Sequence, residues 1–140
     1  MTTHGRLISL VLAFALTTGS SALAQSPHDV QGRIERSSQL QQEALTSLSD
    51  PARAEELVWK AYRELKGAHS AMIIKASALK FQDPLMDLNS QKANEALSLL
   101  QRAGDALRSN RQAPSPLPYL EEVRSSIERA FRLTNLVLAL

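Results

Sequence analysis

The chain contains no cysteine among its 140 residues. This absence excludes disulfide bonds, thiolate metal sites, covalently attached c-type haem and cysteine nucleophiles. The folded protein must therefore be held together by packing and hydrogen bonding, even in a compartment where disulfides form.

Glycine and aromatic residues are also scarce. The sequence has 5 Gly, 3 Phe, 2 Tyr and 1 Trp. It contains no glycine-rich phosphate loop, no G-x-S-x-G elbow and no H-E-x-x-H pair. Nothing in it indicates nucleotide chemistry or the corresponding hydrolase classes, and the pattern favours a non-catalytic protein.

Neither sign of charge predominates. The chain carries 16 Lys and Arg against 14 Asp and Glu, and the two signs are interleaved. A near-neutral, mixed surface lacks the basic patch that attracts nucleic acids and anionic membranes. We therefore expect no nucleic-acid partner.

The first 24 residues have the three parts of a secretory signal peptide. Arg6 supplies positive charge, Leu7–Leu16 reads LISLVLAFAL, and Ala22 and Ala24 give the A-x-A pattern before Gln25. Ten apolar residues are too few for a membrane-spanning helix, which needs about 20. We expect cleavage after Ala24, a periplasmic or secreted product, and no stable membrane insertion after cleavage.

Residues 25–140 make up 116 of the 140 residues, a usual size for one domain. An N-capping residue stands before proline at three places: Asp50-Pro51, Asp83-Pro84 and Ser115-Pro116. Between these signals the chain is rich in residues that favour helix over strand. The pattern predicts four helices, over residues 29–48, 51–82, 84–110 and 117–139.

Short connections make neighbouring helices antiparallel, so we expect an all-α, up-down-up-down four-helix bundle. Apolar residues at helical spacing mark the faces that should be buried. The predicted core residues are Ala54, Leu57, Val58, Ala61, Tyr62, Leu65, Ala68, Met72, Ala76 and Leu79 on the second helix; Leu85, Ala93, Ala96, Leu97, Leu100, Ala103 and Leu107 on the third; and Leu120, Val123, Ile127, Ala130, Phe131, Val137 and Leu138 on the fourth.

The first helix has the weakest apolar face, because Ser37 and Gln41 interrupt it. It is also too short to cover the second helix completely. The alternative architecture is therefore a three-helix core with a loosely docked first helix, which leaves part of the second helix open to a partner.

Three polar residues on or beside the apolar faces form a candidate ligand site. Counted along the helices from Asp83, Lys75, Asn89 and Lys92 lie at a similar height. If they converge, they form a mildly cationic pocket for a small anion. The alternative is that both lysines lie beside the stripes and extend their ammonium groups to water.

His69 and Met72 have a spacing and chemistry that suit copper or haem. The last helix, however, contains no His, Met or Cys that could supply a further ligand. We therefore predict no metal site and no cofactor, with Met72 as a core residue.

Four apolar residues fall outside the predicted core and form a candidate interaction surface: Trp59, Ile73, Ile74 and Phe81. Leu133, Leu136 and Leu140 likewise lie behind the core face of the fourth helix. Surplus apolar side chains of this kind mark contact surfaces. We expect an exported, non-catalytic bundle that contacts a protein partner or a second copy of itself. The alternatives are a module that binds a small anion, metal or haem, and a secreted all-helical enzyme.

Overall fold

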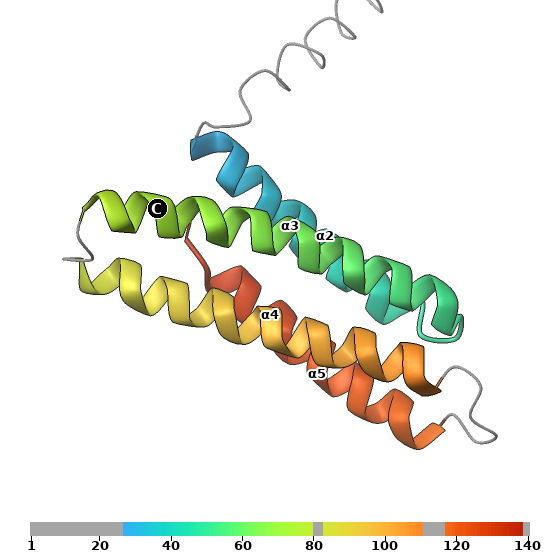
Figure 1. The fold of residues 1–140 in the computed structure, drawn as a ribbon. Helices are drawn as coiled ribbons and strands as arrows, with labels where there is room; N and C mark the ends of the chain where they lie inside the picture. The colour runs from blue at the N-terminus through green and yellow to red at the C-terminus, as the bar shows by residue number, and fades with distance from the viewer. Residues whose placement is uncertain (1–26, 80–82, 111–116, 139–140) are drawn as a thin grey trace, which may run out of the picture.

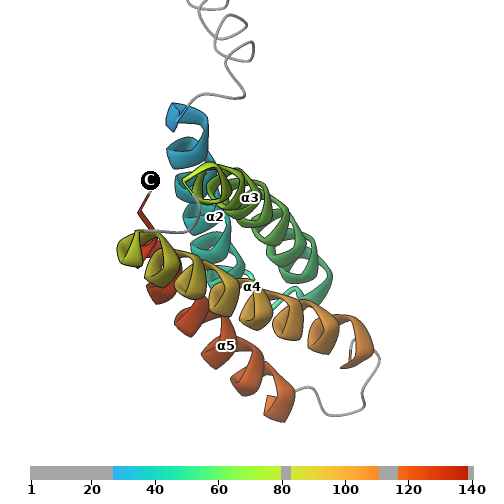
Figure 2. The ribbon, with the colours of Figure 1, turned by 60° about the vertical axis from the view of Figure 1, so that its left-hand side comes forward.

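The computed structural model describes residues 27–79, 83–110 and 117–138. Its four helices are α2 (Pro27–Thr46), α3 (Pro51–Ala78), α4 (Pro84–Asn110) and α5 (Leu117–Leu136). Consecutive helices run in opposite directions, and α2 packs against both α3 and α5 while α4 packs against the same two helices (Figures 1 and 2). The predicted all-α four-helix bundle is confirmed, and α2 belongs to it.

Three helices end earlier than the sequence predicts. α2 ends at Thr46, α3 at Ala78 and α5 at Leu136. At the end of α3, the N–H of Leu79 donates to the carbonyls of both Lys75 (3.2 Å) and Ala76 (3.1 Å). Such sharing is common where a terminal turn tightens. The predicted signal peptide, with Ala22, Ala24 and Gln25, lies outside the described residues, as does Phe81.

Two of the predicted capping residues begin their helices as expected. Asp50 Oδ1 accepts a hydrogen bond from the N–H of Arg53 (3.3 Å), with Pro51 in the first turn. Asp83 Oδ1 accepts from the N–H of Leu85 (2.9 Å) at the start of α4. Both bonds use N–H groups that have no partner inside the helix.

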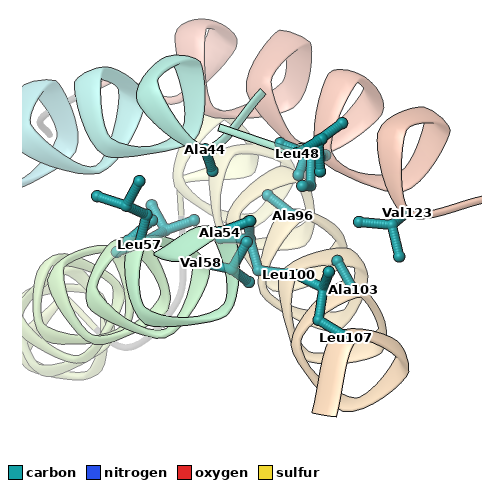
Figure 3. Close-up of a cluster of buried hydrophobic side chains, with 14 of the residues drawn as sticks. Ala44, Leu48, Ala54, Leu57, Val58, Ala96, Leu100, Ala103, Leu107 and Val123 are labelled. Carbon is teal, nitrogen blue, oxygen red and sulfur yellow. The ribbon is translucent and has the colours of Figure 1, made fainter. Parts of the chain in front are cut away.

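The core consists mainly of leucine and alanine contributed by all four helices. The larger of two buried clusters includes Leu57 and Val58 from α3, Leu100 and Leu107 from α4, and Val123 from α5 (Figure 3). The smaller cluster lies towards the turn between α3 and α4, and its buried members are Ile34, Ala68, Met72, Ala93 and Val137. Across the described ranges, no helix has the length and apolarity needed to cross a membrane.

A buried polar network joins α2 to its two neighbours. The Nε2 group of Gln41 donates to Ser37 Oγ (3.1 Å) and to Thr134 Oγ1 (2.9 Å). Ser37 Oγ in turn donates to the carbonyl of Ala61, and Thr134 Oγ1 to that of Ala130, each at 2.8 Å. Ser37, Gln41 and Thr134 have no exposed surface. The residues that interrupt the apolar face of α2 are thus themselves hydrogen-bonded to α3 and α5.

The indole of Trp59 lies between α3 and α4, where α4 presents a glycine. A Cβ atom on Gly104 would stand 2.6–2.9 Å from three indole atoms, closer than real Cβ contacts. Tyr62 meets the indole edge-on, with ring centroids 5.6 Å apart, and the guanidinium of Arg108 lies 5.3 Å from its centroid. Gly104 therefore makes room for the ring, and Arg108 adds a cation–π contact.

Replacing Gly104 by Ala should destabilise the protein. The added Cβ meets a rigid ring, so we expect a net loss of about 1–2 kcal/mol in the free energy of unfolding, in spite of better helix propensity. Gly67→Ala is the matched control, since its Cβ meets only the flexible end of Arg33. That variant should gain about 0.5–1 kcal/mol. Urea denaturation followed by circular dichroism measures both, and equal effects would contradict the packing described for Trp59.

Thr134→Val should destabilise the protein by about 1–3 kcal/mol, because it leaves a buried N–H of Gln41 without its acceptor. Thr46→Val, at an exposed position of α2, should change the free energy of unfolding by less than about 0.5 kcal/mol. Replacing the whole network, in S37A/Q41L/T134V, should recover part of the loss, since no polar side chain is then left unpaired. A triple variant less stable than T134V would refute this account. Urea denaturation again provides the measurement.

Candidate functional site

One end of the bundle is left incompletely covered because its helices differ in length. α3 and α4 have 28 and 27 residues, whereas α2 and α5 have 20 each. At 1.5 Å per residue the difference is about 10–12 Å. In Figure 1, the end of α3 and the start of α4 extend beyond the C-terminal end of α5. This is the end of the bundle at which α3 passes into α4.

Large apolar side chains are exposed at this end. Among the described residues, six large hydrophobic side chains are between 49% and 72% exposed, and all lie in or just after the last turns of α3 and α5 or in the first turns of α4. We call them together the apolar end. Its members are Ile74, Leu79, Leu85, Leu88, Leu136 and Leu138.

Three members of the apolar end correct the predicted core. Leu79, Leu85 and Leu138 were expected inside, but they are 51%, 49% and 50% exposed. Each lies in or just beyond a terminal turn of its helix. Ile74 and Leu136, by contrast, lie outside the core as the sequence indicates, with exposures of 72% and 56%.

A small cavity opens between α3 and α4 at the apolar end. Its volume is about 140 Å³. Met72, Ile73 and Ala76 line it from α3, and Met86 lines it from α4. The remaining described lining residues are polar: Asp83, Asp87, Asn89 and Ser90. The cavity is thus apolar on the side of α3 and carries two carboxylates beside the start of α4.

The side chain of Asn89, on α4, is hydrogen-bonded to the backbone just beyond the end of α5. Its Oδ1 accepts from the N–H of Leu138 and its Nδ2 donates to the carbonyl of the same residue, both at 2.7 Å. Nδ2 also lies 3.3 Å from the sulfur of Met72. The side chain is only 4% exposed. Both ends of its amide are therefore engaged within the protein.

The two lysines predicted to share a ligand site with Asn89 lie nearer the surface. Lys75 is exposed on α3 and Lys92 is half-buried on α4. Neither is among the described residues that line the cavity beside Asn89. The binding of a small anion by Lys75, Asn89 and Lys92 stays a prediction.

His69 is half-buried beside α4. Its Nε2 lies 2.9 Å from Ser90 Oγ. Burial lowers the pKa of His69 below its usual value, because desolvation disfavours the charged imidazolium. Within the described ranges, no three side chains drawn from His, Cys, Asp and Glu are grouped so that they could hold a metal ion.

The residues predicted for an interaction surface fall in different places. Ile74 belongs to the apolar end and Ile73 lines its cavity. Trp59 lies elsewhere on α3, half-buried against Gly104, and Phe81 is outside the described residues. The sequence missed Leu88, whose exposure follows from its place near the start of the protruding α4.

Neither a protein-family model, nor a curated protein, nor a solved structure matches this chain. Its function is therefore inferred from its own side chains. The region that stands out is the apolar end, where exposed aliphatic side chains, a cavity and two exposed carboxylates occur together.

Replacing Asn89 by Ala should loosen the C-terminal end of α5. The variant loses both hydrogen bonds to Leu138, so hydrogen exchange at the Leu138 amide should become about tenfold faster, the equivalent of about 1.4 kcal/mol. Asn94→Ala, at an exposed position of the same helix, serves as the control and should leave this exchange unchanged. Exchange measured by NMR distinguishes the two. If the Leu138 amide exchanges in both variants at the rate of the unchanged protein, Asn89 does not hold the end of α5.

Proposed function

We propose that this protein is an exported, non-catalytic helical bundle that works by binding another protein through its apolar end. The observation that carries the proposal is the gathering of every exposed large hydrophobic side chain of the described residues at one end of the bundle. Apolar residues scattered singly over a surface need no explanation, whereas exposed apolar residues gathered in one region often mark a site of interaction. The signal-like sequence of residues 1–24 supports export, with residues 25–140 as the mature domain.

The composition of the apolar end favours protein contact over small-molecule chemistry. Its members are all leucine or isoleucine, which supply buried area and shape but no acid, base or nucleophile. Burying such side chains contributes about 25 cal/mol per Å² of apolar area. Four of its six members lie on the packed helices α3, α4 and α5, which give this part of the surface a rigid backbone. Rigid apolar surface of this kind suits helix-on-groove contact with a partner.

A photo-crosslinking amino acid at the apolar end should capture the partner. The full chain is produced in cells with p-benzoylphenylalanine at Leu88 or, as a matched control, at Gln101, which is exposed further along α4. We expect an adduct of one defined mass from position 88 and none from position 101. An adduct of twice the chain's mass identifies the partner as a second copy.

Polar replacements at the apolar end should abolish that adduct without unfolding the protein. I74S/L85S removes two exposed aliphatic side chains, whose loss should change the free energy of unfolding by less than about 1 kcal/mol. The purified partner should then bind this variant at least about tenfold more weakly than the unchanged protein. Adducts of equal yield from positions 88 and 101, or adducts unaffected by I74S/L85S, would contradict the proposal.

A further inference from the structure

The cavity between α3 and α4 has the size of a socket for one side chain. Its volume of about 140 Å³ is close to that of apolar cavities known to bind benzene, about 150 Å³. It is lined by Met72, Ile73, Ala76 and Met86, and the exposed Ile74 and Leu85 adjoin these residues in sequence. Interface anchors are commonly large side chains that enter pockets of this kind, surrounded by less important contacts.

The charged groups that line the cavity are negative. Asp83 and Asp87 are both exposed and both belong to its lining, whereas no Lys or Arg is found there among the described residues. Being four residues apart at the start of α4, the two carboxylates lie on the same side of the helix. Asp83 accepts from the N–H of Leu85, and Asp87 accepts from Gln91 Nε2 at 3.2 Å. Neither has a cation within ion-pair distance in the part of the chain that the structure describes.

We propose that the partner's contacting segment is an amphipathic helix with one large apolar side chain that fills this cavity and a Lys or Arg one turn away that pairs with Asp83 and Asp87. This inference rests on the proposed function and specifies the partner's chemistry. The apolar side chain supplies most of the affinity, because it is fully desolvated in the cavity. The basic residue sets orientation and excludes acidic segments, since like charges repel at close range.

Two synthetic peptides test the proposed chemistry. Both are fluorescently labelled amphipathic helices of about 15 residues with leucine at the same positions, and their polar residues are all lysine in one and all glutamate in the other. The full-length protein should bind the lysine peptide, as measured by fluorescence anisotropy, and should bind the glutamate peptide at least about tenfold more weakly. Added salt should weaken the lysine peptide's binding, because it screens exposed charges.

Variants assign the binding to the cavity and its carboxylates. D83N/D87N should weaken binding of the lysine peptide about fivefold, as expected for two exposed ion pairs. The control is D105N, which removes an exposed carboxylate elsewhere on α4 and should change the affinity less than about twofold. Ile73→Trp places a large ring at the cavity's edge and should weaken binding of both peptides. Circular dichroism shows whether each variant is folded.

Each result supports or overturns the inference separately from the proposed function. Three results would overturn the inference of a basic partner with an apolar anchor. They are equal affinity for the two peptides, equal effects of D83N/D87N and D105N, and no binding of the lysine peptide. Unchanged affinity in a folded I73W would exclude the cavity as the socket. In each of these cases, a crosslinked adduct at Leu88 that I74S/L85S abolishes would still support protein contact through the apolar end.

Discussion

The unequal lengths of the helices determine what this bundle can present at its surface. α3 and α4 form a hairpin longer than the two helices that cover it, and the excess of about 10–12 Å is roughly two turns. Within the covered length, leucine and alanine stripes meet and exclude water. Beyond it, α3 and α4 have only each other to pack against, and side chains outside that contact stay exposed. The apolar end thus has two origins. Leu79 and Leu85 lie at the end of the longer α3–α4 hairpin, whereas Ile74 and Leu136 lie outside the buried faces of their own helices.

A second constraint fixes α2 in the bundle. Its apolar face is weak in sequence because Ser37 and Gln41 interrupt it, yet both side chains are fully buried, and Ser37 Oγ and Gln41 Nε2 are hydrogen-bonded. Burying a polar group is costly unless it finds a partner. Here the partners lie on α3 and α5, so the bonds form only when α2 adopts this register. Polar residues that reduce the hydrophobic driving force therefore specify the position of the helix.

Much of the fold could be predicted from the sequence, because helix starts and apolar faces are local properties. Asp50-Pro51 and Asp83-Pro84 mark real helix starts, and most of the residues assigned to the core are buried. The errors arise where the outcome depends on distant residues. The spacing of apolar residues shows which face of α4 carries Leu85. It does not show whether another helix extends far enough to bury that side chain. Likewise Trp59 lies outside the apolar arc of α3, yet it is packed because Gly104 lies opposite on α4. No local pattern links Gln41 with Thr134, 93 residues away.

The separation between the core and the apolar end has a consequence for function. Side chains such as Leu65 and Ile127 are fully buried and hold the bundle together, whereas Ile74 and Leu88 are largely exposed and contribute little to its stability. Substitutions at the apolar end can therefore change this surface while the fold is kept. The exception is Asn89, which holds the end of α5 and also lines the cavity, so changes there affect both. A surface that contributes little to folding can change in sequence without loss of the fold, and the contact proposed for the apolar end relies on this freedom.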